Sequence, residues 1–428
     1  MSGGGRNHVI DVARACSVLV VVVFHTLLYR IELTEAGPTL VPWAAPTWLY
    51  PLSWVLMIMP LFFVAGGFAH TLTVDRMRRE GSGPAHYLAS RGRRLVGPLV
   101  VFVSFCAVIS SLAAWAGWLD AASELSRLLM QLLWFITVYL GIVVAAPVAV
   151  RLHDRFGAVP MVVLALLAAG VDAWSFAADR YELRNLNMAL VWPLVHQFGI
   201  AYQRGWWRRG PVWVAWASVL AGSALVALLV FGFGYPPSSV GFADLPIANI
   251  QPPTLAMAAL ALAQCGALAL VERSGVLASL PPRVERVLGV VNAVMVSVYL
   301  WHIPCIGLAG GALALVALTF PGAAPVLLSP AVLAPASLAV VALVVPLLGR
   351  LELRLIPPLG PRQDLPLAAL AFAVLGLGTL LVWQTGTVVH PGRPASTLGV
   401  ALVMLGAWLM VRAADASQAA VGNIPRSG

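Results

Sequence analysis

Long apolar runs alternate with short polar segments along almost the whole chain. A bilayer core about 30 Å thick is crossed by a helix of about 20 apolar residues, and twelve runs of roughly this kind are bounded by charges or by glycine and proline. The sixth and twelfth are short and the ninth is long. The predicted spans are 8–29, 50–73, 95–118, 129–150, 157–177, 187–203, 211–233, 254–271, 287–318, 331–349, 366–385 and 397–412. The pattern therefore predicts an all-α, polytopic integral membrane protein.

The composition supports this class. The 428 residues are 60% hydrophobic and 10% charged, whereas a soluble domain has about 25% charged residues. Soluble, coiled-coil, collagen-like, disordered and disulfide-stapled proteins are excluded by the same figures. The four cysteines lie in apolar stretches, which favours buried free thiols. No metal-binding motif is present, and we expect neither a metal site nor a permanently bound cofactor.

Arginine placement gives the predicted orientation. All 26 basic residues are arginine, and with the N-terminus inside, twenty-one lie on the cytoplasmic side. The five outside are Arg30, Arg127, Arg180, Arg184 and Arg393. Positive charge concentrates on cytoplasmic loops, so we expect an even number of spans and two cytoplasmic termini. The net charge of +9 is then a property of topology, and the bilayer, not nucleic acid, is the expected partner.

The domain organisation follows from the spans. Residues 1–362 are predicted to form the membrane core, 363–412 two additional transmembrane helices, and 413–428 a short, polar, disordered cytoplasmic tail. We expect no cleaved signal peptide and no fused soluble domain. The outer segment 234–253, rich in proline and glycine, is long enough to fold over a site.

Three ionisable residues lie in the first span, where each is a functional candidate because charge is costly inside a membrane. At 100° per residue, Asp11 lies about 60° and His25 about 20° from Arg14 around the helix. All three therefore share one face. Two interpretations stay open: the face lines a reactive cavity, or Asp11 and Arg14 form a structural pair and His25 is an interfacial histidine.

Other spans carry isolated polar residues. For Asp172, His196 and His302, hydrogen bonding between helices is as good an explanation as chemistry. Tyr299 lies on the same side of its helix as His302. His70 is expected at headgroup level, at the cytoplasmic end of the second span.

The first span, with Arg14, ten residues and then His25, resembles the signature of acyltransferase family 3, which comprises integral membrane enzymes that O-acylate sugars and other acceptors. Similar motifs follow in order: MPLFFVAGGF at 59–68, the arginine pair that opens the third span, LWFITVYL at 133–140 and YLWHIP at 299–304. Segments 186–202 and 249–254 look like those of actinobacterial members. The resemblance covers roughly 8–362.

The chain departs from the family pattern at three points. It has Gly66-Gly67 where many members have Ser-Gly. Its last two spans lie beyond the usual ten-helix core. We expect no counterpart of the secreted esterase-like domain that is fused to some members.

The resemblance implies a plasma-membrane enzyme that uses acyl-CoA, most simply acetyl-CoA, from the cytoplasm. His25 is expected to act as general base or as a covalent acyl carrier. Arg14 would steady charge on the donor or the oxyanion, with Asp11 holding it. The cytoplasmic arginines Arg91, Arg93 and Arg94 are expected to bind coenzyme phosphates, although topology alone also explains them. Three further arginines, Arg76, Arg78 and Arg79, are assigned to topology.

The acceptor is expected to be a hydroxyl of a glycan, a glycolipid or other lipid-linked molecule, or a secreted small molecule. Residues assigned to acceptor binding are Tyr299, His302, Asp172, His196 and Trp134. Three alternatives stay open: a proton-coupled transporter or exporter, an N-acylating enzyme of the same class, and a degenerate member that serves as a sensor or assembly partner.

Overall fold

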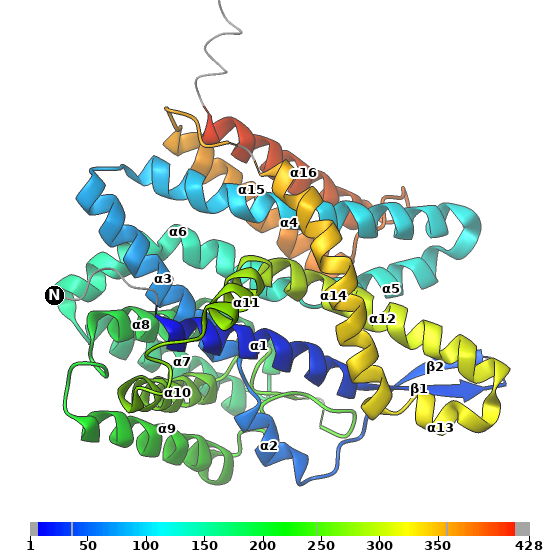
Figure 1. The fold of residues 1–428 in the computed structure, drawn as a ribbon, viewed down its shortest axis with the longest axis horizontal. Coiled ribbons are helices and arrows are strands. Elements are labelled where there is room, and N and C mark those ends of the chain that lie inside the picture. The colour runs from blue at the N-terminus through cyan, green and yellow to red at the C-terminus, as the bar shows by residue number, and fades with distance from the viewer. Residues whose placement is uncertain (1–6, 36, 246, 357, 416–428) are drawn as a thin grey trace, which may run out of the picture. The chain divides into compact units, whose positions relative to one another are not determined.

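The computed structural model describes residues 7–35, 37–245, 247–356 and 358–415 (Figure 1). Within these ranges the chain is helical apart from one two-stranded hairpin and two isolated bridges. Eleven of the described helices are long and apolar enough to cross a membrane. The prediction of an all-α, polytopic membrane protein is confirmed, with eleven such helices in place of the expected twelve.

The difference lies in the predicted sixth span, 187–203. Residues Tyr181–Ala189 form a 3-10 helix, η2, and α8 begins only at Val191 and ends at Arg204. At 1.5 Å per residue, the 14 residues of α8 extend about 21 Å, short of a bilayer core of about 30 Å. Pro193 lies in the first turn of α8, where a residue without an N–H is tolerated. The apolar run is therefore longer than the helix within it.

Two other predicted spans are divided or extended. The ninth is broken at Val294 into α11 (Pro282–Ala293) and α12 (Met295–Thr319). The third begins earlier than predicted, because α4 runs Pro84–Ala113 and continues through η1 (Ala114–Trp118) into α5 (Leu119–Met130). Gly117, with φ of 101°, allows the turn between α4 and α5. The predicted tail lies outside the described residues from 416 onward, and α16 (Pro394–Ala414) includes its first two residues.

The described chain divides into two compact units. The first comprises residues 1–72, 148–295 and 308–338. It contains α1 (His8–Leu27), the antiparallel hairpin β1 (Tyr29–Thr34) and β2 (Gly37–Pro42), and α2 (Leu49–Val55). It also holds α7 (Val159–Ala177), η2, α8, α9 (Val212–Phe233), α10 (Leu255–Ser274) and α11. The short η3 (Pro321–Ala323) and α13 (Ala324–Leu327) also belong to it, as do parts of α3 (Met59–Glu80), α6 (Leu133–Phe156), α12 and α14 (Pro330–Leu355).

Small residues bring the helices of this unit together. Figure 1 shows α9 and α10 side by side, and Gly222 of α9 leaves no room for a side chain against Ala259 and Ala263 of α10. Gly67 of α3 (Met59–Glu80) and Gly199 of α8 meet in the same way, backbone against backbone. Close approach through glycine and alanine is typical of helix packing in membranes.

The second unit comprises residues 73–147, 296–307 and 339–428. It contains α4, α5, the first part of α6 (Leu133–Phe156), the end of α14 (Pro330–Leu355), α15 (Leu365–Thr385) and α16. The helices α15 and α16 pack tightly on each other, and both contact α4 (Figure 1). The last two helices are thus an integral part of this unit.

Candidate functional site

The first helix presents its three ionisable residues at half-buried positions. The helix α1 is continuous from His8 to Leu27 and is capped by Asn7, whose side-chain oxygen accepts a hydrogen bond from the Ile10 amide at 3.1 Å. Because the helix has no break, Asp11, Arg14 and His25 lie on one face as their spacing predicts.

His25 is oriented by its own helix. Its Nδ1 lies 2.8 Å from the carbonyl oxygen of Val21, one turn earlier. A carbonyl only accepts, so Nδ1 must carry the proton that is donated in this bond. In the neutral ring, Nε2 is then the basic nitrogen. The backbone thus sets His25 in the tautomer that a general base requires, with Nε2 directed away from Val21.

The N-terminal end of α1 is held by α11. The amide nitrogen Nδ2 of Asn292 donates to the backbone carbonyl of Asp11 at 3.1 Å. His8 and Glu285 face each other with Nε2 and Oε1 3.4 Å apart. The helix α11, unpredicted as a separate element, therefore fixes the end of α1 that carries Asp11.

An aromatic cluster surrounds the C-terminal end of α1. Phe24, next to His25 in sequence, packs with Phe242 at 6.5 Å between ring centroids. Trp43 and Tyr50 pack on the same Phe242 ring at 6.4 Å and 5.9 Å. The Tyr50 hydroxyl donates to Asp244 at 2.5 Å, and this bond lowers the pKa of the Asp244 carboxyl. The outer segment 234–253 is therefore packed against the end of the helix that bears His25.

Asp172 fixes both ends of this outer segment. Its buried carboxylate accepts hydrogen bonds from the Tyr235 hydroxyl at 2.9 Å, the Leu255 amide at 2.8 Å and the Asn187 side chain at 2.9 Å. Tyr235 begins the segment and Leu255 begins α10 directly after it. Arg184, 1% exposed, lies over the Phe176 ring at 4.4 Å. The hydrogen bonds to Asp172 account for its buried carboxylate by structure alone.

Further bonds fix the middle of the segment. Asn249 donates to the carbonyls of Pro236 and Ser238 at 2.8 Å and 2.7 Å. Ser239 donates to the Ser53 backbone carbonyl at 2.8 Å. The Trp54 indole donates to Pro237 at 2.9 Å. These contacts attach the described residues of the segment to α2. That the segment folds over a site stays a prediction.

Two buried histidines pair between α3 and α8. Nδ1 of His70 lies 3.0 Å from Nε2 of His196, and the side chains are 0% and 2% exposed. His70 is expected at the end of the second span, whereas α3 continues beyond it to Glu80. Its level relative to the headgroups stays a prediction. The assignment of His196 to acceptor binding stays untested, and its contact with His70 explains its burial.

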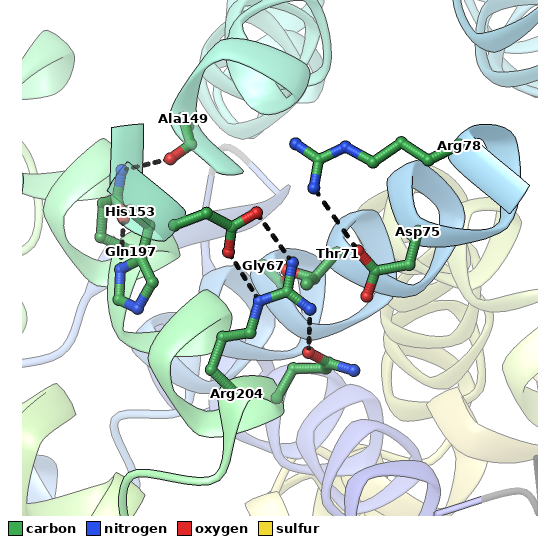
Figure 2. A network of polar contacts seen from close by, with 10 residues as sticks. Gly67, Thr71, Asp75, Arg78, Ala149, His153, Gln197 and Arg204 are labelled. Carbon is green, nitrogen blue, oxygen red and sulfur yellow. Dashed lines mark hydrogen bonds and ion pairs between the residues drawn. The ribbon is translucent and has the colours of Figure 1, made fainter. Parts of the chain in front are cut away.

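The neighbouring turn of α8 is tied to α6. His153 Nδ1 lies 3.2 Å from Oε1 of Gln197, and Gln197 Nε2 donates to the Ala149 carbonyl at 3.2 Å (Figure 2). The Arg204 guanidinium donates two hydrogen bonds to the Asp154 carboxylate, from Nε at 2.8 Å and from Nη2 at 3.1 Å. These contacts fix the C-terminal half of α8 beside the end of α6.

The second unit contains an arginine-lined pocket where α3 turns into α4. The pocket encloses about 290 Å³. Its lining residues are Thr73, Arg76, Met77, Glu80, His86, Tyr87, Ser90, Arg91, Arg93, Arg94 and Leu359. Arg91 donates to the Thr73 hydroxyl. Four guanidinium groups face one carboxylate here, so the pocket is strongly cationic and suits a polyanionic ligand.

The helix α4 brings three of these arginines to the pocket and is supported by the last two helices. Gly92, between Arg91 and Arg93, lies against Met410 of α16 and Phe372 of α15. Leu359 follows α14, and the next amide, of Gly360, donates to the Ala414 carbonyl at 2.9 Å. The end of α16 therefore helps to place the pocket wall.

The remaining predicted acceptor residues lie in the second unit. His302 is fully buried, with Nδ1 2.7 Å from the Tyr299 carbonyl, so its Nε2 is also the basic nitrogen. The Tyr299 hydroxyl donates to the Leu132 carbonyl at 2.9 Å, and its ring packs on Phe135 at 4.9 Å. Trp134 is 3% exposed. The motif YLWHIP is thus packed against the start of LWFITVYL.

No group of three or more potential metal ligands occurs in the described part of the chain. All four cysteines are free there. Cys106, Cys265 and Cys305 are buried as expected, whereas Cys16 is exposed. An apolar sequence environment thus located three buried thiols, but it does not distinguish the two faces of α1.

Comparison with known proteins adds a decisive observation. The family model described as "Acyltransferase domain" matches residues 7–349, which run from the cap of α1 into α14. The chain belongs to acyltransferase family 3. No curated protein and no solved structure matches it. This membrane acyltransferase therefore carries its family domain in α1 to α14, and α15 and α16 lie outside the matched range.

The structure groups the predicted residues of this acyltransferase by unit. The first unit contains Asp11, Arg14 and His25, together with Asp172 and His196 in their separate buried networks. The second contains the arginine pocket and the Tyr299–His302 pair.

Sequence reasoning missed two residues of the acyltransferase. Arg76, assigned to topology, lines the same pocket as Arg91 and Arg94. Glu352, overlooked near the end of an apolar run, is 3% exposed and accepts hydrogen bonds from Ser297 and from Trp301, the latter at 3.3 Å. A buried carboxylate in a span was a detectable signal, whereas nothing in the sequence separates Arg76 from Arg79.

Proposed function

We propose that this acyltransferase transfers an acetyl or other short acyl group from acyl-CoA to a hydroxyl of a glycan, a lipid-linked molecule or a secreted small molecule. One observation carries the proposal: on the helix that opens the family domain, the Val21 carbonyl holds His25 in the tautomer with a basic Nε2. A histidine so arranged is suited to deprotonate a hydroxyl near neutral pH.

The transfer requires one group that takes a proton from the acceptor and returns it to the leaving thiolate, and His25 alone serves as that base. Nε2 accepts the proton of the acceptor hydroxyl while its oxygen attacks the thioester carbonyl carbon. The tetrahedral intermediate then collapses, the carbon–sulfur bond breaks, and the coenzyme A thiolate leaves. The imidazolium returns the proton to this thiolate. The products are an ester and free coenzyme A, and His25 is regenerated.

Arg14 and the arginine pocket supply positive charge in this scheme. Arg14 shares the face of α1 with His25, and we assign it to the developing oxyanion or to the donor, with Asp11 as its orienting partner. Arg91, Arg93 and Arg94 bind phosphates of the coenzyme, because guanidinium groups pair bidentately with phosphate. The pocket geometry around α4 supports this assignment.

The acceptor residues are proposed from their placement in the motifs. Tyr299 and His302 carry polar groups in the YLWHIP motif. Trp134 follows closely after Leu132, whose carbonyl accepts the hydrogen bond from Tyr299. We retain these three as acceptor-positioning residues. Asp172 and His196 are fully engaged in the contacts described above, and we propose structural roles for both.

The orientation is proposed from the arginines. With the α3–α4 turn in the cytoplasm of a bacterial cell and the enzyme in its plasma membrane, the pocket faces the compartment that holds acyl-CoA. Two cytoplasmic termini then require α8, though short, to count as a crossing. Local thinning of the bilayer accommodates such short segments.

Mass spectrometry of surface glycans, lipids and secreted metabolites tests the proposal. Cells with the gene are expected to carry an acyl mass that cells without it lack, and cells with His25→Gln to resemble the latter. His8→Gln is the matched control on the same helix. Identical acyl profiles with and without the gene would refute the proposed transfer and favour a transporter or a non-catalytic role.

A second measurement separates a base from a covalent carrier. Labelled coenzyme A is incubated with unlabelled acetyl-CoA and the purified protein, without acceptor. An acyl-histidine intermediate exchanges label into acetyl-CoA, because the half-reaction is reversible. Direct attack by the acceptor predicts no exchange. Rapid exchange that His25→Gln abolishes would make His25 a nucleophile.

A further inference from the structure

The arginine pocket at the α3–α4 turn carries an inference about the donor that rests on the proposed function. We propose that this pocket binds the nucleotide end of the coenzyme, including its ribose 3′-phosphate, and so selects free acyl-CoA over an acyl group on a carrier protein. Arg76 of α3 is the proposed specificity-determining residue.

The charge of the pocket lining matches the nucleotide end of the coenzyme. Coenzyme A carries three phosphate groups, all at its nucleotide end, whereas its pantetheine arm and thioester are uncharged. The pocket offers four arginines with His86 against a single glutamate, Glu80. A lining of this kind compensates several phosphates and offers little to an uncharged arm. The first turn of α4, which begins at Pro84 and includes His86, adds the positive end of a helix dipole.

The volume of the pocket fits only part of the coenzyme. Pockets that hold a drug-sized molecule usually enclose about 300–1,000 Å³, and this pocket encloses about 290 Å³. It is therefore large enough for a phosphorylated sugar with part of its base, but too small for the whole coenzyme. The long arm must extend out of the pocket.

The charge and the size of the pocket distinguish free acyl-CoA from an acyl group on a carrier protein. A carrier protein presents its acyl group on a phosphopantetheine that has a single phosphodiester and no adenosine 3′-phosphate. Such a donor offers the cationic lining one phosphodiester where coenzyme A offers three phosphate groups. Free acyl-CoA supplies the missing charges.

Arg76 is singled out among the arginines of α3. Arg76 lines the pocket, whereas the pocket lining does not include Arg78 or Arg79. Arg78 instead lies 3.9 Å from Asp75 one turn earlier (Figure 2). Arg79 is exposed on the same helix. Arg79 therefore provides a control of equal charge and nearly equal position.

The test measures binding without any acceptor. Purified full-length protein in nanodiscs is titrated with coenzyme A, with dephospho-coenzyme A and with adenosine 3′,5′-bisphosphate. We expect the wild type to bind coenzyme A at least about tenfold more tightly than the dephospho form, which corresponds to about 1.4 kcal/mol. Arg76→Gln is expected to remove most of this ratio, and Arg79→Gln to retain it. Adenosine 3′,5′-bisphosphate is expected to compete with coenzyme A.

The outcomes separate this inference from the proposed function. If the wild type binds coenzyme A but Arg76→Gln keeps the full ratio, or the bisphosphate fails to compete, the inference is wrong while acyl-CoA remains the donor. If the wild type binds neither coenzyme, both are wrong. Equal transfer rates from acetyl-CoA and an acetylated carrier protein would also overturn the selection proposed here.

Discussion

Gly92 of α4 lies directly against Met410 of α16, so closely that a Cβ on residue 92 would overlap the Met410 thioether. Gly92 stands between Arg91 and Arg93, and Met410 is fully buried. A helix outside the matched family domain thus supports the helix that carries the arginines proposed to bind phosphate. This contact gives α15 and α16 a role that their sequence does not reveal.

Truncation of Met410 tests this role. Met410→Ala is expected to lose about 2–5 kcal/mol of stability, as buried methionine-to-alanine changes do, and to raise the KM for acyl-CoA because α4 loses its support. The control is Met257→Ala in α10, where the methionine is equally buried. It should lower thermal stability similarly and leave this KM unchanged. Equal KM values for both variants would show that α16 stabilises the fold without placing the arginines.

The crossing of α3 and α8 depends on two glycines. A side chain at Gly67 would collide with the His196 carbonyl, and one at Gly199 with the Val64 carbonyl. Backbone atoms cannot move aside as flexible side chains do, so Gly67→Ala is expected to cost about 1–3 kcal/mol or more. Gly170→Ala in α7 is the control, because nothing lies within 4 Å of its added Cβ. Thermal melting of both purified variants checks this, and a fully stable Gly67→Ala protein would disprove the close crossing.

The outer segment 234–253 depends on Asp172. Asp172→Asn places an amide N–H group opposite donors and leaves at least one of them unpaired, which costs about 1–3 kcal/mol. Limited proteolysis is expected to cut the segment faster in this variant than in the wild type. Tyr235→Phe removes one hydrogen bond and should have the smaller effect. If Asp172→Asn is cleaved no faster than the wild type, other contacts hold the segment.

Periodicity and charge predicted much of the fold, because lipid solvation imposes one rule on every span. The prediction was least accurate where a helix is shorter than its apolar run, as in α8, or where a run contains a break, as at Val294. Neither feature alters hydropathy. The length of an apolar run therefore does not set the length of a helix, since α3 and α4 extend beyond their runs.

The candidate site was predictable in part. Spacing alone places Arg14 and His25 on one face, because a continuous helix has a fixed angle per residue. The bond from His25 to Val21 also follows from helical geometry. By contrast, the contacts of His70 with His196 and of Gly92 with Met410 join residues more than a hundred positions apart. A single sequence contains no signal for such pairs.

The rate of acyl transfer by His25→Gln tests the central claim most directly. Purified wild type, His25→Gln and His8→Gln are compared with acetyl-CoA and the acceptor fraction whose acyl mass depends on the gene, with coenzyme A release and acyl incorporation measured together. We predict a loss of about 10²- to 10⁴-fold for His25→Gln, the usual contribution of a general base, at unchanged coenzyme A binding. His8→Gln should retain wild-type activity. Transfer by His25→Gln at the wild-type rate would contradict the account.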